Sequence, residues 1–118
     1  MKTLKELFQK ESPFLLIAGP CAIEGEEMAF KIALKCQEIA KKHCIEYVFK
    51  GSFKKANRSK IDSFTGIGDV KALKILSKIR NELKIPVTTD VHEVSHIEIA
   101  KEHVDIIQIP AFLARQTD

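Results

Sequence analysis

The segment from Ile45 to Ser59 reads IEYVFKGSFKKANRS, and it carries the clearest signal of the fold. Its first five residues form an apolar run typical of a buried strand, and a polar loop follows directly. That loop, Lys50–Ser59, holds three lysines, an arginine, an asparagine and two serines, and no acid. Because lysine and arginine bind phosphate and carboxylate groups, the strand end predicts an anion-binding loop. A solvated basic loop is the alternative that composition leaves open.

The composition is that of one globular domain covering residues 1–118, with 45% hydrophobic and 30% charged residues. The formal charge of +3 is too small to indicate a nucleic-acid or membrane partner. No apolar run has the length that a membrane-spanning helix needs, and the N-terminus lacks the pattern of a signal peptide. The three cysteines match no zinc or disulfide spacing, which favours a reducing, cytoplasmic setting.

The rest of the chain alternates between short apolar runs and amphipathic stretches. Strands are predicted near 14–18, 45–49, 86–90 and 104–109, and helices near 25–43, 69–83 and 94–103. Residues 1–10 are predicted to form a short amphipathic helix or an extension. The first strand reads as buried on both faces. The predicted inner faces of the two long helices are Met28, Ile32, Cys36 and Ile39, and Val70, Leu73, Leu76, Ile79 and Leu83. This order predicts an α/β fold with a parallel sheet covered by helices.

Polar residues follow the end of every predicted strand. These residues are Cys21 and Glu24, the Lys50–Ser59 loop, Asp90 and His92, and the segment from Gln108 to Asp118. Ligands bind at this edge of α/β folds. No Gly-x-Gly-x-x-Gly motif follows the first strand, which argues against a dinucleotide-binding fold. The simplest architecture is the first four β/α units of a TIM-type (β/α)8 barrel, ending after the fourth strand.

Spacing alone leaves the role of Cys21 open between a metal ligand, a nucleophile and a small packing residue, and it favours packing. Cys36 and Cys44 are predicted to be packing residues. Asp90 and His92 alternate as strand residues do, so they are expected to face the same way and to serve acid–base or orienting roles. A helix N-cap is the alternative for Asp90.

Gln108 is predicted to be a polar residue inside a buried strand, which requires partners and marks a site. Arg115 is a second candidate phosphate ligand, with a surface arginine as the alternative. The remaining histidines, His43, His96 and His103, are predicted to lie on helical surfaces without a functional role.

Four motifs together resemble 3-deoxy-D-manno-octulosonate 8-phosphate synthase, over essentially the whole chain. They are Ile17–Glu24 (IAGPCAIE), Phe49–Ser59, Thr89–Glu93 (TDVHE) and Asp105–Asp118. The sister family, 3-deoxy-D-arabino-heptulosonate 7-phosphate synthase, shares the Gly-Pro-Cys opening. It carries Lys-Pro-Arg-Thr where this chain has Lys55–Arg58, and Gly-Ala-Arg-Asn where this chain has Pro110–Leu113, so both differences favour the octulosonate enzyme.

The resemblance implies an eight-unit β/α barrel, a homotetramer, in the cytoplasmic route to lipopolysaccharide. It implies condensation of phosphoenolpyruvate with arabinose 5-phosphate and water, releasing phosphate. Lys50 and Lys55 would bind phosphoenolpyruvate, and Asp90 would lie at the centre of the site. The other implied contacts are Asn57 with the sugar, Arg58, Ser59 and a neighbouring subunit's Arg115 with its phosphate, and Gln108 and the Ala111 backbone with phosphoenolpyruvate. Among these, Lys55, Asn57 and Asp90 are the expected catalytic residues. Cys21 would be a ligand to a divalent metal, which reverses the reading from spacing.

Some positions depart from the family pattern. The chain has Lys54 where the family has Asp, Gly51 where it has Ser or Ala, and Thr65 where it has Arg. The family's other metal ligands come from the second half of the barrel, so the 118 residues alone are expected to be inactive and to self-associate. The heptulosonate enzyme, and a non-catalytic half-barrel that binds sugar phosphates, are the alternatives.

Overall fold

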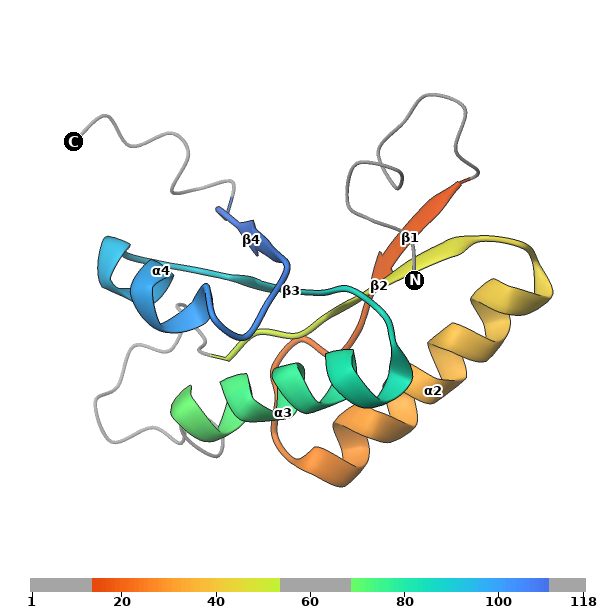
Figure 1. The fold of residues 1–118 in the computed structure, drawn as a ribbon, viewed down its shortest axis with the longest axis horizontal. Helices are drawn as coiled ribbons and strands as arrows, with labels where there is room; N and C mark the ends of the chain where they lie inside the picture. The colour runs from red at the N-terminus through yellow and green to blue at the C-terminus, as the bar shows by residue number, and fades with distance from the viewer. Residues whose placement is uncertain (1–13, 54–68, 111–118) are drawn as a thin grey trace.

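The computed structural model of the chain describes residues 14–53 and 69–110, which form a parallel sheet with helices packed against it (Figure 1). The elements are β1 (Leu15–Ala18), α2 (Glu26–Lys42), β2 (Glu46–Lys50), α3 (Asp69–Leu83), β3 (Val87–Asp90), α4 (Val94–Ala100) and β4 (Ile106–Gln108). The strands lie in the order β1-β2-β3-β4, and each neighbouring pair is parallel. The predicted β/α alternation is therefore confirmed, whereas the short helix predicted within 1–10 lies outside the described residues.

The core lies between the sheet and the helices α2 and α3, which run side by side along one of its faces (Figure 1). Leu73, Leu76 and Ile79 of α3 are fully buried, together with Phe49 of β2 and Val87 of β3. These three positions recur every three or four residues, as the helical period requires. The predicted inner face of α3 is confirmed for them, while Val70, in the first turn, is 55% exposed.

The predicted inner face of α2 is confirmed for Ile32 and Cys36, which pack against the core, and wrong for Met28 and Ile39. Met28 is 60% exposed and Ile39 is 44% exposed, whereas Ala29, Ala33 and Ala40 are buried. Small alanine side chains let the backbone of the helix lie close to the sheet, and Ile32 and Cys36 pack at the margin of the core. The buried side of α2 therefore carries small apolar residues, which fit where the helix packs closely against the sheet, and not the larger ones.

Strand β1 is also less buried than its apolar run predicts. Ile17 is 45% exposed and Phe14, just before the strand, is 73% exposed. In the described part of the chain β1 is an edge strand that pairs only with β2, so its run covers one packed face and one open face. The side that faces the helices is closed by Tyr47, whose hydroxyl donates to the Ala18 carbonyl at 2.7 Å. Burial, together with contact to Cys36, holds the pKa of Tyr47 well above its ordinary value.

The last helix and strand are shorter than predicted. Helix α4 ends at Ala100, and residues 101–103 form turns, with the His103 N–H donating to the Ala100 carbonyl at 2.9 Å. Strand β4 begins at Ile106, and the residue before it, Asp105, makes two hydrogen bonds with Val87. The Asp105 N–H donates to the Val87 carbonyl, and Asp105 Oδ2 accepts from the Val87 N–H, both at 3.0 Å.

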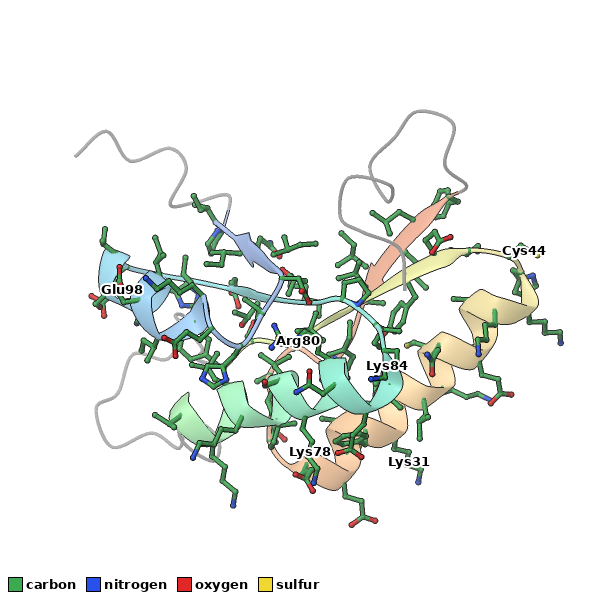
Figure 2. The ribbon with its side chains drawn as sticks, in the orientation of Figure 1. Lys31, Cys44, Lys78, Arg80, Lys84 and Glu98 are labelled. Atoms are coloured by element: carbon green, nitrogen blue, oxygen red, sulfur yellow. The ribbon has the colours of Figure 1, made fainter. Side chains whose placement is uncertain are left out.

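Charged side chains cover the solvent side of the two long helices. Figure 2 shows Lys31 and Lys78 pointing away from the sheet, whereas Arg80 lies between α3 and the strands. Lys78 Nζ is 3.2 Å from Glu26 Oε2 and links α3 to α2, and Arg80 Nη1 is 4.0 Å from Asp105 Oδ1. Among the helices of residues 14–53 and 69–110, none has the length and apolarity to cross a membrane.

Candidate active site

The carboxyl ends of all four strands meet in one row of neighbouring residues. Ala22, beyond β1, forms an isolated bridge with Ser52, beyond β2. The Ser52 hydroxyl contacts Asp90 at the end of β3, and Asp90 is the register partner of Gln108 at the end of β4. The predicted convergence of polar residues at this edge is thus seen at Ser52, Asp90 and Gln108.

Lys50 pairs with Thr88, so it lies two residues before that row along the strands. Its side chain is partly exposed, and the next residue is tied to the sheet by the Gly51 N–H, which donates to the Thr88 carbonyl at 3.2 Å. Lys50 thus lies near the row without being fully buried. Lys50 is the last residue of β2, one residue beyond the predicted end of the strand, and lies at the carboxyl edge of the sheet as expected.

Gly19 permits β1 to approach β2 at this edge. A Cβ atom at position 19 would lie 1.7 Å from the Lys50 carbonyl oxygen and 2.7 Å from its carbonyl carbon. Real Cβ atoms do not come that close to a backbone, so only glycine fits this position without moving one of the strands. The close approach of the two strands therefore explains why the Gly19-Pro20-Cys21 motif begins with glycine.

Asp90 and His92 face each other, as their alternation predicts. His92 Nε2 is 3.1 Å from Asp90 Oδ2, and the two side chains are 12% and 15% exposed respectively. The other carboxylate oxygen, Oδ1, accepts a hydrogen bond of 2.5 Å from Ser52 Oγ. Ser52, Asp90 and His92 thus form a continuous chain of polar contacts. Asp90 is not a helix N-cap, since Glu93 occupies that position for α4.

His96 corrects the prediction that it lies on a helical surface. Its residue is 4% exposed, and its Nδ1 accepts a hydrogen bond of 3.0 Å from the backbone N–H of His92. Phe53 meets the imidazole edge-on, with ring centroids 5.4 Å apart. The signal that sequence reasoning missed is the spacing of His96 and Ala100, the two buried residues of α4. Of the other histidines, His43 is exposed as predicted, whereas His103 lies half-buried in the turn after α4.

The prediction that Gln108 is buried within a strand is wrong. Its side chain is exposed, because β4 is the second edge strand of the described sheet and is only three residues long. The backbone of Gln108 is nevertheless fixed against β3, since its carbonyl accepts from the Val91 N–H at 3.0 Å. An exposed amide at the strand end is available to a ligand without any cost of burial.

Cys21 is exposed at the end of β1 and lines a pocket of about 190 Å³. The same pocket is lined by Glu24 and by apolar atoms of Ile23, Met28 and Ala29. Residues 14–53 and 69–110 contain no group of three or more His, Cys, Asp or Glu side chains that fits a metal ion. A stable divalent site needs more ligands than this thiol, so the described residues do not form a metal site by themselves. Cys44, predicted to be a packing residue, is exposed as well.

The departure at Gly51 has a structural explanation. A Cβ atom there would lie 2.4 Å from Ile23 Cδ1 and 3.1 Å from Ile23 Cγ1. The end of the Ile23 side chain thus occupies the space that the side chain of a serine or alanine would need. The other departures, Lys54 and Thr65, lie outside the described residues, as do the candidate site residues Lys55, Asn57, Arg58, Ser59, Ala111 and Arg115.

Comparisons with known proteins agree with this geometry. The model of the DAHP synthetase I family matches residues 4–118. A protein of Desulfotalea psychrophila named 2-dehydro-3-deoxyphosphooctonate aldolase is 51% identical over 106 residues, which are 90% of this chain and 38% of that protein. Proteins of the same name from Bordetella petrii and Francisella tularensis are each 50% identical, over 92% and 90% of this chain. The chain spans 38% of the length of each of these three relatives. It belongs to the DAHP synthetase I family and is a homologue of its 2-dehydro-3-deoxyphosphooctonate aldolases.

Proposed function

We propose that this chain supplies one side of the active site of a 2-dehydro-3-deoxyphosphooctonate aldolase. The enzyme would condense phosphoenolpyruvate with arabinose 5-phosphate and water, giving 3-deoxy-D-manno-octulosonate 8-phosphate and phosphate for lipopolysaccharide synthesis. The observation that carries the proposal is the position of Lys50, Asp90 and Gln108 at the same carboxyl edge of the sheet. The names of relatives about half identical in sequence supply the reaction.

The chemistry needs an edge of this kind because both substrates are anions. Their phosphate groups repel each other, and fixed ammonium and guanidinium groups offset that repulsion while they orient the enol carbon toward the aldehyde. Lys50 and Lys55 would bind phosphoenolpyruvate, with Gln108 and the Ala111 backbone at the same end. Asn57 would bind the sugar, and its phosphate would be held by Arg58, Ser59 and Arg115, the last from a neighbouring subunit.

Asp90 would lie between the two substrates, within reach of the imidazole of His92, from which it is 3.1 Å away. A carboxylate in this position accepts a hydrogen bond and stabilises a proton on the neighbouring imidazole. Together with Lys55 and Asn57, Asp90 completes the proposed catalytic set. Cys21 would be one ligand of a divalent metal whose other ligands come from outside the described residues, and no step is assigned to that metal.

In the complete enzyme, residues 1–118 would form the first four units of an eight-unit barrel. We place that enzyme in the cytoplasm as a homotetramer, without nucleic-acid or membrane partners. The tetramer gives Arg115 its role, since its phosphate contact would be made across a subunit boundary.

The proposal is tested with a hybrid enzyme in which this chain replaces the matching 106 residues of the Desulfotalea psychrophila relative. Phosphate release from phosphoenolpyruvate is measured with arabinose 5-phosphate or erythrose 4-phosphate, with the unaltered relative as the control. The proposal requires turnover with arabinose 5-phosphate and at least tenfold less with erythrose 4-phosphate, about 1.4 kcal/mol of discrimination. The 118-residue chain alone should release no phosphate.

Two other results would contradict the proposal. A preference for erythrose 4-phosphate would favour the heptulosonate enzyme, which the description of the matching family model makes the second candidate. Calorimetric binding of both phosphates by a folded hybrid that does not turn over would instead favour a non-catalytic sugar-phosphate-binding protein.

A further inference from the structure

Two side chains that lie behind the Asp90–His92 contact hold it in place from opposite sides. We propose that Ser52 and His96 are positioning residues, with Ser52 orienting the Asp90 carboxylate and His96 fixing the backbone that carries His92. The geometry stands on the described residues, while its meaning for catalysis rests on the function proposed above.

Ser52 is itself fixed by β1 and β2. Its residue is 8% exposed, it bridges to Ala22, and its carbonyl accepts from the Ile23 N–H at 2.9 Å. The hydroxyl therefore has a set position from which it donates to Asp90 Oδ1 at 2.5 Å. Hydrogen bonding to one carboxylate oxygen limits rotation of the group, so the other oxygen, Oδ2, stays directed at His92 Nε2, 3.1 Å away.

The two ring nitrogens of His96 have different neighbours. Its Nδ1 accepts from the His92 N–H, so that nitrogen carries no proton. Its Nε2 lies 3.2 Å from Glu93 Oε1, without a hydrogen bond between the two atoms. The imidazole thus bonds the chain immediately after β3 to the first turns of α4.

This bond joins the residue before the N-cap of α4 to the first turn of the helix. Glu93 is the N-cap of α4, and its side chain makes no capping hydrogen bond. A side-chain cap bonds a free N–H of the first helical turn, whereas the N–H of His92 lies before the N-cap. The bond from the His92 N–H to His96 therefore fixes the chain that enters the helix, and the edge-on contact with Phe53 restricts rotation of the imidazole.

Two matched pairs of substitutions separate a positioning role from a general effect on folding. In His96→Asn the side-chain oxygen takes the place of Nδ1 and keeps the acceptor, whereas His96→Gln places its polar atoms near Nε2 and loses it. Ser52→Thr keeps the hydroxyl, whereas Ser52→Ala removes it. Thermal unfolding of all four variants shows whether each still folds.

The first measurement needs no substrate and uses the 118-residue chain labelled with ¹⁵N and ¹³C. We expect a coupling across the hydrogen bond between the His92 amide nitrogen and His96 Nδ1, with Nδ1 unprotonated. His96→Gln should raise the exchange rate of the His92 amide about tenfold, the factor that one net hydrogen bond represents, and His96→Asn should not. Ser52→Ala, but not Ser52→Thr, should shift the Asp90 carboxyl resonance. Absence of the coupling, or a protonated Nδ1, would overturn the proposal.

The second measurement uses the hybrid enzyme. His96→Gln and Ser52→Ala should lower kcat about tenfold or more, with KM for both substrates within about threefold, while His96→Asn and Ser52→Thr should retain kcat within threefold. Unchanged kcat in all four variants of an active hybrid would overturn the positioning role and leave the proposed function intact. If the unsubstituted hybrid has no activity, the proposed function fails, and the resonance measurements alone decide whether Ser52 and His96 hold the Asp90–His92 contact.

Discussion

At the carboxyl end of β1, a single missing side chain determines how closely two strands approach. Gly19 lies against the Lys50 carbonyl, where a Cβ atom would come within 1.7 Å of the oxygen. The atom that it would meet belongs to the backbone, which cannot rotate away as the end of a flexible side chain does. At Gly51 the nearest atom is the Cδ1 of Ile23, a side-chain end, so a substitution there meets a softer obstacle.

We therefore expect Gly19→Ala to lower the free energy of unfolding by about 3 kcal/mol, the upper part of the range for overpacking. Displacement of β1 would also move Lys50 and should abolish turnover by the hybrid enzyme. Urea denaturation followed by circular dichroism measures the stability. Gly25→Ala is the matched control, because no atom lies within 4 Å of a Cβ there and its φ of −176° is extended. It should change stability by less than about 1 kcal/mol. Equal effects at the two glycines would contradict the argument.

The residues of the candidate site differ in how far the sequence alone predicted them. Asp90 and His92 were predictable because their two-residue spacing places both on one side of an extended chain. Ser52 was predicted at this edge as part of the Lys50–Ser59 loop, but its contact with Asp90, 38 residues away, was not. His96 was not predicted, because it acts across a turn. Gln108 was placed correctly at the strand end but with the wrong burial, since the sequence does not say which strand is an edge.

At the scale of helices and strands, the order of elements follows from the change between apolar runs and helical spacing, and all four strands were predictable. Which side of a helix is buried was less so. For α3 large side chains fill the core, and the period identifies them. In α2 the side chains that fill the core are alanines. They are less hydrophobic than Met28 and Ile39, which lie on the exposed side, so the sequence pattern favours the wrong side. Which of these two sets of side chains is buried depends on how closely the helix packs against the sheet, and that is fixed only in the folded structure.

The end of α2 offers a test at the same scale. The Ile45 N–H donates to the Ala40 carbonyl at 2.8 Å, and the Cys44 N–H donates to the Lys41 carbonyl at 3.2 Å. This is the Schellman arrangement, which places Cys44 in the left-handed region, at φ 57°. Glycine adopts that conformation without the steric penalty of a Cβ atom, about 1 kcal/mol or more.

We expect Cys44→Gly to stabilise the chain by about 0.5 to 1 kcal/mol, the penalty relieved minus the added entropy of the unfolded chain. Lys84→Gly, after α3 and also at φ 57°, should act in the same direction. The control is Lys41→Gly, within the last turn of α2, which should destabilise by up to about 1 kcal/mol. Midpoints of urea denaturation compare the variants. Destabilisation by both Cys44→Gly and Lys84→Gly would show that the backbone conformation is not strained there.

At the scale of the whole molecule, the described sheet has covered and open surfaces. Helices α2 and α3 cover one face, whereas β1 and β4 are edges that pair on one side only within residues 14–53 and 69–110 (Figure 1). Ile17 on β1 is 45% exposed, and Ile109, next to β4, is 61% exposed. Apolar side chains on strands with unpaired backbone groups promote association between chains.

The 118-residue chain should therefore self-associate at micromolar concentration, and a charge on the open edge should oppose this. Ile17→Lys, at a half-exposed position, is expected to reduce the associated fraction in sedimentation velocity at least severalfold while leaving the circular dichroism spectrum unchanged. Met28→Lys is the matched control, because Met28 is more exposed, at 60%, but belongs to helix α2 and not to an edge strand. It adds the same charge, so a general effect of net charge on solubility would appear equally in both variants. A monodisperse monomer before any substitution would contradict the prediction. An equal response to both lysines would assign the association to net charge and not to the edge of the sheet.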